Sequence, residues 1–147
     1  MRQQVIAALV VGSLGIGAVA GCASSTEYTV RGSEKSVGVD GTITIAPQSE
    51  DVNLVAVELV NLPPPERHDK TKKAFVVWIT PADGVTIRAG RLAYDAKTRI
   101  GTLQATTPND VVFVQVTAEE DSTVAKPSDL VLVAKHVTLK RPDTASQ

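Results

Sequence analysis

Apolar and polar residues alternate along most of the chain with the period of two that is typical of β-strands. The alternation is clearest over Val111–Glu119, where Val112, Val114 and Val116 fall on one side. Residues 75–80 are apolar at nearly every position, which is typical of a central strand covered on both faces. No stretch combines a helical period with capping residues at its ends. The pattern therefore predicts an all-β protein.

The other strand candidates are separated by residues that favour turns. Pro63 to Pro65 end one strand, because proline cannot donate to a strand ladder, and Pro81–Gly84 has the composition of a β-turn. Of the 126 residues from Cys22 onward, 38 are Val, Thr or Ile, which suit a pleated surface. Seven or eight strands at this spacing predict an antiparallel immunoglobulin-like β-sandwich. The remaining candidates are Val37–Ile45 around an Asp40-Gly41 turn, Leu54–Leu62, Thr86–Tyr94, Arg99–Thr106 and Asp129–Leu139.

The amino-acid composition argues against several classes of function. The 147 residues carry 15 Lys and Arg against 16 Asp and Glu, so there is no basic excess to attract nucleic acid. A single Cys excludes a disulfide within the chain, and two His offer little for a metal site. We therefore expect one folded domain without a cofactor and without a nucleic-acid partner.

The N-terminal segment has the pattern of an export signal. Arg2 precedes Val5–Ala20, an uncharged run shorter than the roughly 20 apolar residues of a membrane-spanning helix. The run ends in Val19-Ala20-Gly21-Cys22, which resembles the lipobox of bacterial lipoprotein precursors. This resemblance implies cleavage before Cys22, a diacylglycerol on its thiol and an acyl chain such as palmitate on its new amine. The alternative is a transmembrane anchor with an incidental Cys.

The resemblance also implies a location and a division of the chain. Ala23 stands where an Asp would signal retention in the inner membrane of enterobacteria, which favours an outer-membrane lipoprotein facing the periplasm if the host has an outer membrane. The expected parts are a signal peptide over residues 1–21, a lipidated Cys with a flexible tether over 22–35, a β-sandwich over 36–140 and a disordered tail over 141–147.

Residues 75–137 resemble a second family, the extracytoplasmic domain of anti-sigma-K factors. The matching elements are Val76-Val77-Trp78-Ile79, Ala89-Gly90-Arg91-Leu92, Val116-Thr117-Ala118-Glu119 and Pro127-Ser128. The resemblance implies an immunoglobulin-like sandwich with no catalytic residue to transfer. The chain departs from the family at Glu120-Asp121-Ser122, which replaces a glycine pair, and it shows neither a sigma-binding helical domain nor a membrane-spanning helix. Anti-sigma activity is therefore not expected.

Several other side chains are candidate site residues. His68 is expected in a solvated loop, His136 on a sheet edge, and Trp78, with apolar neighbours, in the core. Glu119-Glu120-Asp121 lacks the alternate spacing of a calcium loop, so a hydrated strand end is expected there. Ser122 and Ser128 lack the Gly-x-Ser-x-Gly context of a hydrolase nucleophile.

The segment Pro63–Lys73 is the best candidate for a contact surface. Three prolines stiffen its start, and four cations follow: Arg67, Lys70, Lys72 and Lys73. This cluster predicts contact with an anionic surface or an acidic partner, although Glu66 and Asp69 lower the net positive charge of the segment. A solubilising loop is the alternative.

The sequence as a whole predicts an exported, lipid-anchored protein of the cell envelope. We expect a non-enzymatic binding or structural module that meets the membrane through its lipid and contacts an envelope protein or an anionic surface. A small envelope hydrolase and a metal-dependent adhesion module are the alternatives. No catalytic residue and no metal ligand are expected.

Overall fold

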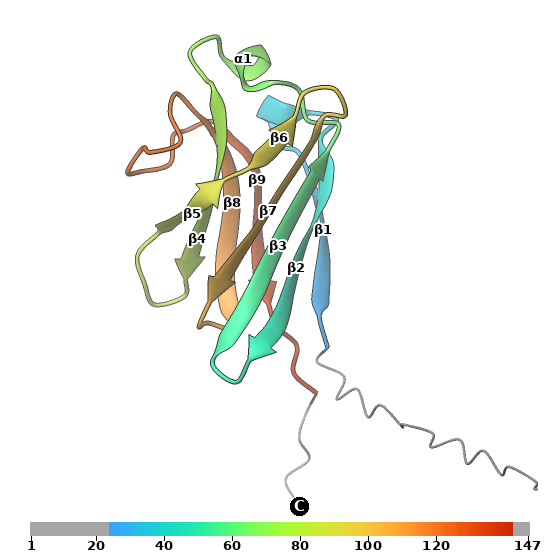
Figure 1. Ribbon diagram of the computed structural model, residues 1–147, viewed down its shortest axis with the longest axis vertical. Coiled ribbons are helices and arrows are strands. Elements are labelled where there is room, and N and C mark those ends of the chain that lie inside the picture. Colours follow the sequence, from blue (N-terminus) through green and yellow to red (C-terminus); the bar gives the residue numbers. More distant parts are fainter. Residues whose placement is uncertain (1–23, 143–147) are drawn as a thin grey trace, which may run out of the picture.

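The structure is a computed structural model that describes residues 24–142, and its strands form two antiparallel sheets packed face to face (Figure 1). The predicted all-β sandwich is confirmed, with nine strands in the described part of the chain rather than seven or eight. The described part of the chain also contains one turn of 3-10 helix and one turn of α-helix. In chain order the elements are β1 (Thr26–Arg31), η1 (Glu34–Ser36), β2 (Asp40–Ser49), β3 (Val52–Val60), α1 (Pro65–His68), β4 (Ala74–Pro81), β5 (Ile87–Arg91), β6 (Ala93–Asp95), β7 (Ile100–Thr107), β8 (Val111–Glu119) and β9 (Val131–Thr138).

The first sheet has the strand order β1-β2-β3-β7-β6, and the second has the order β5-β4-β8-β9. Every neighbouring pair is antiparallel. Strand β4 lies inside the second sheet and is buried from Ala74 to Ile79, as its continuous apolar pattern predicted.

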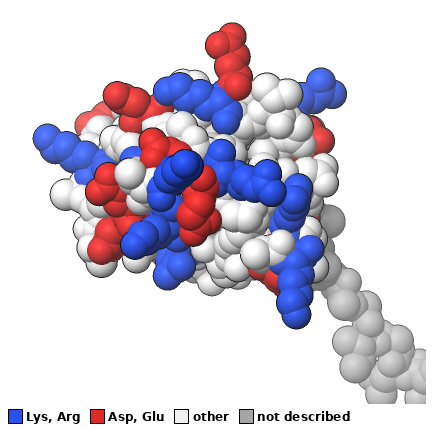
Figure 2. Space-filling view, turned by 90° about the horizontal axis from the view of Figure 1, so that it is seen from above, with Lys and Arg blue, Asp and Glu red and all other residues white. Residues whose placement is uncertain are grey.

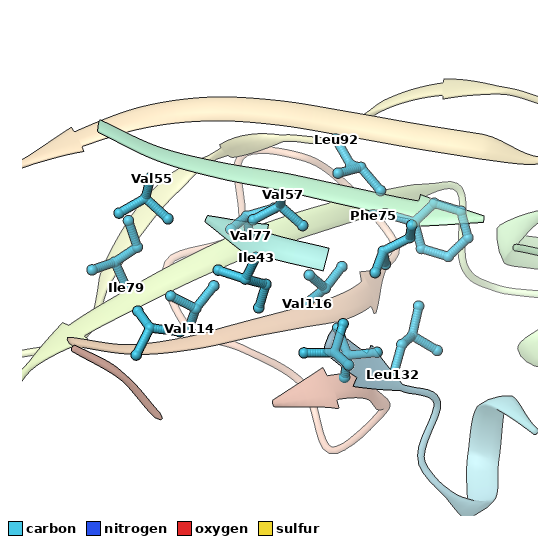
Figure 3. Close-up of a cluster of buried hydrophobic side chains, with 14 of the residues drawn as sticks. Ile43, Val55, Val57, Phe75, Val77, Ile79, Leu92, Val114, Val116 and Leu132 are labelled. Carbon is cyan, nitrogen blue, oxygen red and sulfur yellow. The ribbon is translucent and has the colours of Figure 1, made fainter. Parts of the chain in front are cut away.

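The hydrophobic core fills the space between the two sheets (Figure 3). Alternate residues of each strand point into it, because side chains along a strand alternate between its two faces. The inward set includes Ile43, Val55, Val57, Phe75, Val77, Ile79, Val114, Val116 and Leu132, each no more than 3% exposed.

Two expected turns take a different form. Asp40 and Gly41 lie within β2, where Gly41 sits so close to β3 that a Cβ atom would come within 2.2 Å of the Glu58 carbonyl oxygen. Gly41 thus permits close strand packing, and the chain bends earlier, at Gly38, whose φ is 92°. The expected strand Thr86–Tyr94 is divided into β5 and β6, which belong to different sheets.

The tether expected over residues 22–35 is wrong from Thr26 onward, because β1 forms an edge of the first sheet. The hydroxyl of Tyr28 donates to the Thr138 carbonyl and accepts from the Thr138 amide, and so joins β1 to β9 of the other sheet.

The tail expected over residues 141–147 is held at Arg141, whose side chain donates two hydrogen bonds to Asp110. Those bonds, together with one from Asn53, lower the pKa of Asp110 to about 2.

The sandwich has two distinct ends (Figure 1). At one, the tether pole, β1 begins and β9 ends, and the Lys140 amide donates to the Thr26 hydroxyl. At the other, the α1 pole, lie α1, η1 and the β6–β7 turn. Strand β3 runs from the tether pole to the α1 pole, and its nine residues span about 30 Å at the usual rise per residue.

Candidate functional site

Trp78 is fully buried, as predicted, but it lies on the outer face of the second sheet rather than in the core between the sheets. Its strand neighbours Val77 and Ile79 belong to that core, so the intervening side chain must point the other way. The indole Nε1–H donates to the Thr117 hydroxyl at 2.8 Å, and that hydroxyl donates to Glu119 Oε1 at 2.7 Å. Thr117 and Glu119 are both buried.

The loop between β8 and β9, residues 120–130, is fastened to this outer face. The Ser128 amide donates to Glu119 Oε1 at 2.6 Å, and the Ser128 hydroxyl donates to the Ala118 carbonyl. Arg88 on β5 holds the loop at a second point by donating to the Val124 carbonyl. One carboxylate oxygen therefore accepts from both a strand hydroxyl and a loop amide, and it links the loop to the hydroxyl that accepts from the indole.

Three of the four elements that resemble anti-sigma-K factors meet in this hydrogen-bonded chain, which we call the Trp–Glu network. Its members are Trp78, Thr117, Glu119 and Ser128. Glu119 Oε1 already accepts hydrogen bonds from the Thr117 hydroxyl and the Ser128 amide. The network therefore has a structural role: it fastens the loop to the second sheet. The resemblance itself stays a prediction.

The segment Pro63–Lys73 lies at the α1 pole. Helix α1 begins at Pro65, the last residue of the proline run, and Asp69 closes the turn that follows the helix by accepting from the Thr71 amide and hydroxyl. These two bonds lower the pKa of Asp69. His68 is not simply solvated: its ring packs edge-on against Phe75 at 6.0 Å, and its Nε2 atom is buried without a hydrogen-bond partner in the described part of the chain.

The four predicted contact residues do lie together on this segment. Arg67, Lys70 and Lys73 are exposed, and Lys72 is half-buried. Figure 2, which looks onto the α1 pole, shows acidic side chains interspersed among the basic ones. The pole is therefore a surface of mixed charge rather than a basic patch.

A cavity of about 730 Å³ opens at the same pole. It lies where α1, the start of β4 and the β5–β6 crossover meet, because the chain leaves the second sheet at Arg91 and enters the first at Ala93. Phe75 and Leu92 are buried in its lining, and Tyr94 packs edge-on against Phe75 at 5.1 Å. Burial raises the pKa of Tyr94, whose hydroxyl donates to the Leu62 carbonyl.

The other weighed residues do not gather into a site. His136 stacks on Phe113 at 4.6 Å on the second sheet, away from His68 at the α1 pole. Asp121 accepts from the Thr123 amide and hydroxyl, which lowers its pKa and turns its carboxylate toward its own loop. Within residues 24–142, no three His, Cys, Asp or Glu side chains lie close enough together to hold a metal ion.

Cys22 and the expected signal peptide lie outside the described residues. Among residues 24–142 no helix has the length and apolar character needed to cross a membrane. Comparisons with protein-family models, with curated proteins and with solved structures give no match to this chain.

Proposed function

We propose that this protein is a lipid-anchored, non-enzymatic binding module of the cell envelope, held by Cys22 and presenting its α1 pole away from the membrane. The observation that carries the proposal is the placement of the two ends of the described chain. Both Thr26 and Lys140 lie at the tether pole, and the cavity and the segment Pro63–Lys73 lie at the opposite end.

Chain length supports this orientation. Three residues separate Cys22 from Thr26, and the four steps along an extended chain from one to the other span at most about 14 Å. An acylated Cys22 would therefore keep the tether pole near the bilayer surface, while the α1 pole would lie about 30 Å further out when the strands stand upright. Two or three acyl chains are enough for stable anchoring.

The chemistry of the cavity supports binding rather than hydrolysis. A covalent hydrolase needs a nucleophile within hydrogen-bonding reach of a base. The residues that line this cavity include neither Ser, Cys nor His, and they combine apolar residues with four charged side chains: Glu66, Lys73, Arg91 and Asp95. That composition is typical of a recognition surface.

Replacing Cys22 with Ser tests the anchor. The variant has no thiol to receive a lipid, so we expect it to move from the detergent phase to the aqueous phase and to keep residues 1–21. Phase partitioning followed by intact-mass measurement reports both changes. A wild-type protein that carries no added acyl mass would contradict the proposal, even if it sediments with membranes.

The basic residues of the α1 pole give a second prediction, which is that this pole contacts an anionic surface. Changing Arg67, Lys70, Lys72 and Lys73 to Ser should weaken binding of a lipid-free chain that begins at Ser24 to anionic vesicles and leave the melting temperature nearly unchanged. Binding of the wild type should also weaken as salt rises, because the Debye length falls from about 10 Å at 0.1 M to about 3 Å at 1 M. Equal binding to anionic and neutral vesicles would remove these residues from the contact surface.

A further inference from the structure

We infer that the tether-pole end of the second sheet makes a second contact with the lipid bilayer, in which apolar side chains enter the boundary between headgroups and acyl chains. This inference rests on the proposed function, because the anchor at Cys22 brings a bilayer to this pole. The contact surface, which we call the apolar tip, consists of Val85, Ile87 and Val111.

The three side chains of the apolar tip are exposed to solvent. The exposed fraction is 82% for Val85, in the turn between β4 and β5, 53% for Ile87 at the start of β5, and 41% for Val111 at the start of β8. Exposed apolar side chains that gather on one part of a surface mark contacts with proteins or membranes. The other two large apolar side chains that are exposed in the described residues, Val37 and Ile100, lie at the α1 pole.

Strand register connects the apolar tip to the anchored end of the chain. Strand β9 ends next to Thr26, because the Lys140 amide donates to the Thr26 hydroxyl. Strand β8 begins beside that end of β9, where Val111 pairs with Thr138. Strand β4 ends opposite the start of β8 and leads into the turn that carries Val85, toward the tether pole in Figure 1. The turn therefore lies at the anchored end, and β5 is only three strand spacings, or about 14 Å, across the sheet from β9.

A cavity lies between the turn and the start of β8. Its volume is about 360 Å³, and its lining includes Ala82, which is exposed in the turn, and Val111. The half-buried ring of Phe113 lines it as well. The turn and the start of β8 thus border the same hollow, and their apolar side chains can meet one bilayer together.

The charges near the turn limit how deeply it can enter. Asp83 is the one charged residue of Pro81–Ile87, and its carboxylate must stay among the headgroups. Arg88 follows directly, but its guanidinium donates to a carbonyl of the β8–β9 loop. The β2–β3 turn at the same pole carries Glu50 and Asp51, which stay in water. The apolar tip is therefore expected to reach about 5–10 Å, the depth of other interfacial segments.

This contact orients the protein rather than anchoring it. Even a single long acyl chain gives only marginal binding to a bilayer, and three small side chains offer less apolar surface than such a chain. On a protein that Cys22 already holds, they would fix which end of the second sheet faces the lipid. Because the contact is apolar, it should form on neutral vesicles and persist at high salt, unlike a contact made by the cations of the α1 pole.

The test uses the acylated full chain in neutral vesicles whose lipids carry a spin label on the acyl chain, just below the headgroup. Val85→Cys and Val37→Cys each carry one fluorophore, and they are matched because Val85 is 82% exposed and Val37 is 83% exposed. We expect about threefold stronger quenching at residue 85 than at residue 37, at low and at high salt, because only the first reaches the depth of the label.

A second pair of variants shows whether the apolar side chains cause the contact. Ile87→Asp, added to Val85→Cys, should lower the quenching at residue 85 to the level at residue 37. Ile100→Asp is the matched control, since Ile100 is also exposed at the first position of a strand but lies at the α1 pole, and it should change nothing. Thermal unfolding shows that both variants fold, and the comparison of residues 85 and 37 does not depend on them.

Three results would overturn the inference. The first is equal quenching at residues 85 and 37, and the second is quenching at residue 85 that survives Ile87→Asp. The third is a blue-shifted emission at residue 85 without quenching, which would show that a protein and not lipid covers the apolar tip. Because intact mass reports the acyl chains independently, the inference can fail while the proposed anchor stands, whereas a chain without acyl mass would contradict the proposed function itself.

Discussion

Replacing Trp78 with Ala is expected to lower the free energy of unfolding by about 3–5 kcal/mol, which is much of the 5–15 kcal/mol that stabilises an ordinary domain. The change removes the largest fully buried side chain of the described sequence. It also leaves the Thr117 hydroxyl without its indole donor. Urea unfolding followed by far-ultraviolet circular dichroism measures the loss, because the variant has no Trp to report by fluorescence.

The variant Trp78→Phe separates packing from hydrogen bonding. It keeps an aromatic ring in the space and removes only the Nε1–H donor to Thr117, so it should cost clearly less than Trp78→Ala. The wild-type protein should show the blue-shifted emission of a buried indole. If Trp78→Ala unfolds at the same urea concentration as the wild type, the indole does not hold the outer face of the second sheet.

Replacing Glu119 with Ala is expected to lower the free energy of unfolding by about 2–4 kcal/mol and to release the loop over the indole. The carboxylate accepts from both the Thr117 hydroxyl and the Ser128 amide, and the change orphans these two donors. Hydrogen exchange of the peptide that covers residues 120–130 should become faster under native conditions, because the Ser128 amide loses its acceptor.

Glu120→Ala is the matched control, since Glu120 is the next residue and is exposed. It removes the same carboxylate chemistry without touching the Trp–Glu network, so its effect should stay within about 0.5 kcal/mol. If the free energy of unfolding falls equally in both variants, or if hydrogen exchange in residues 120–130 is unchanged in Glu119→Ala, the Trp–Glu network does not hold the loop.

The strand pattern was the most predictable part of the fold. Alternation over Val111–Glu119 marked β8 at both ends, and the apolar run over residues 75–80 identified β4 as a central strand. Both signals are local, since they depend only on which side chains face a sheet. Strand β1 was missed because it is short and mostly polar. Only Tyr28 and Val30 pack with the hydrophobic core, so the strand gives little apolar alternation.

The outer-face position of Trp78 could not be read from its neighbours. A strand that is apolar at every position gives no alternation to show which side faces the core. The hydrogen bonds that join Trp78 to the rest of the second sheet and to the loop come from Thr117, Glu119 and Ser128, far along the chain. Only the elements that resemble the anti-sigma-K family linked these segments in the sequence.

The cavity was missed for a similar reason. Its lining combines three segments, residues 64–66, 73–75 and 91–96, that come together only where the chain crosses from one sheet to the other. Gly90, with a φ of 152°, and the register shift between Val77 and Trp78 mark that crossover. The sequence pattern showed one strand over Thr86–Tyr94, because a change of sheet leaves the apolar alternation intact. The sequence showed Glu66 and Asp69 among the four cations of the α1 pole, but not Asp95, which shares the lining of the cavity with Lys73.

The central claim is that the anchored protein turns its α1 pole away from its own membrane, and fluorescence quenching at two positions tests it most directly. After acylation of Cys22 the wild-type chain has no free thiol, so Glu50→Cys at the tether pole or Lys70→Cys at the α1 pole can each carry a single fluorophore. The acylated proteins are placed in vesicles that contain lipids with spin-labelled headgroups. Strong quenching at residue 50 and little at residue 70 is the predicted result; equal quenching at both positions, or stronger quenching at residue 70, would contradict it.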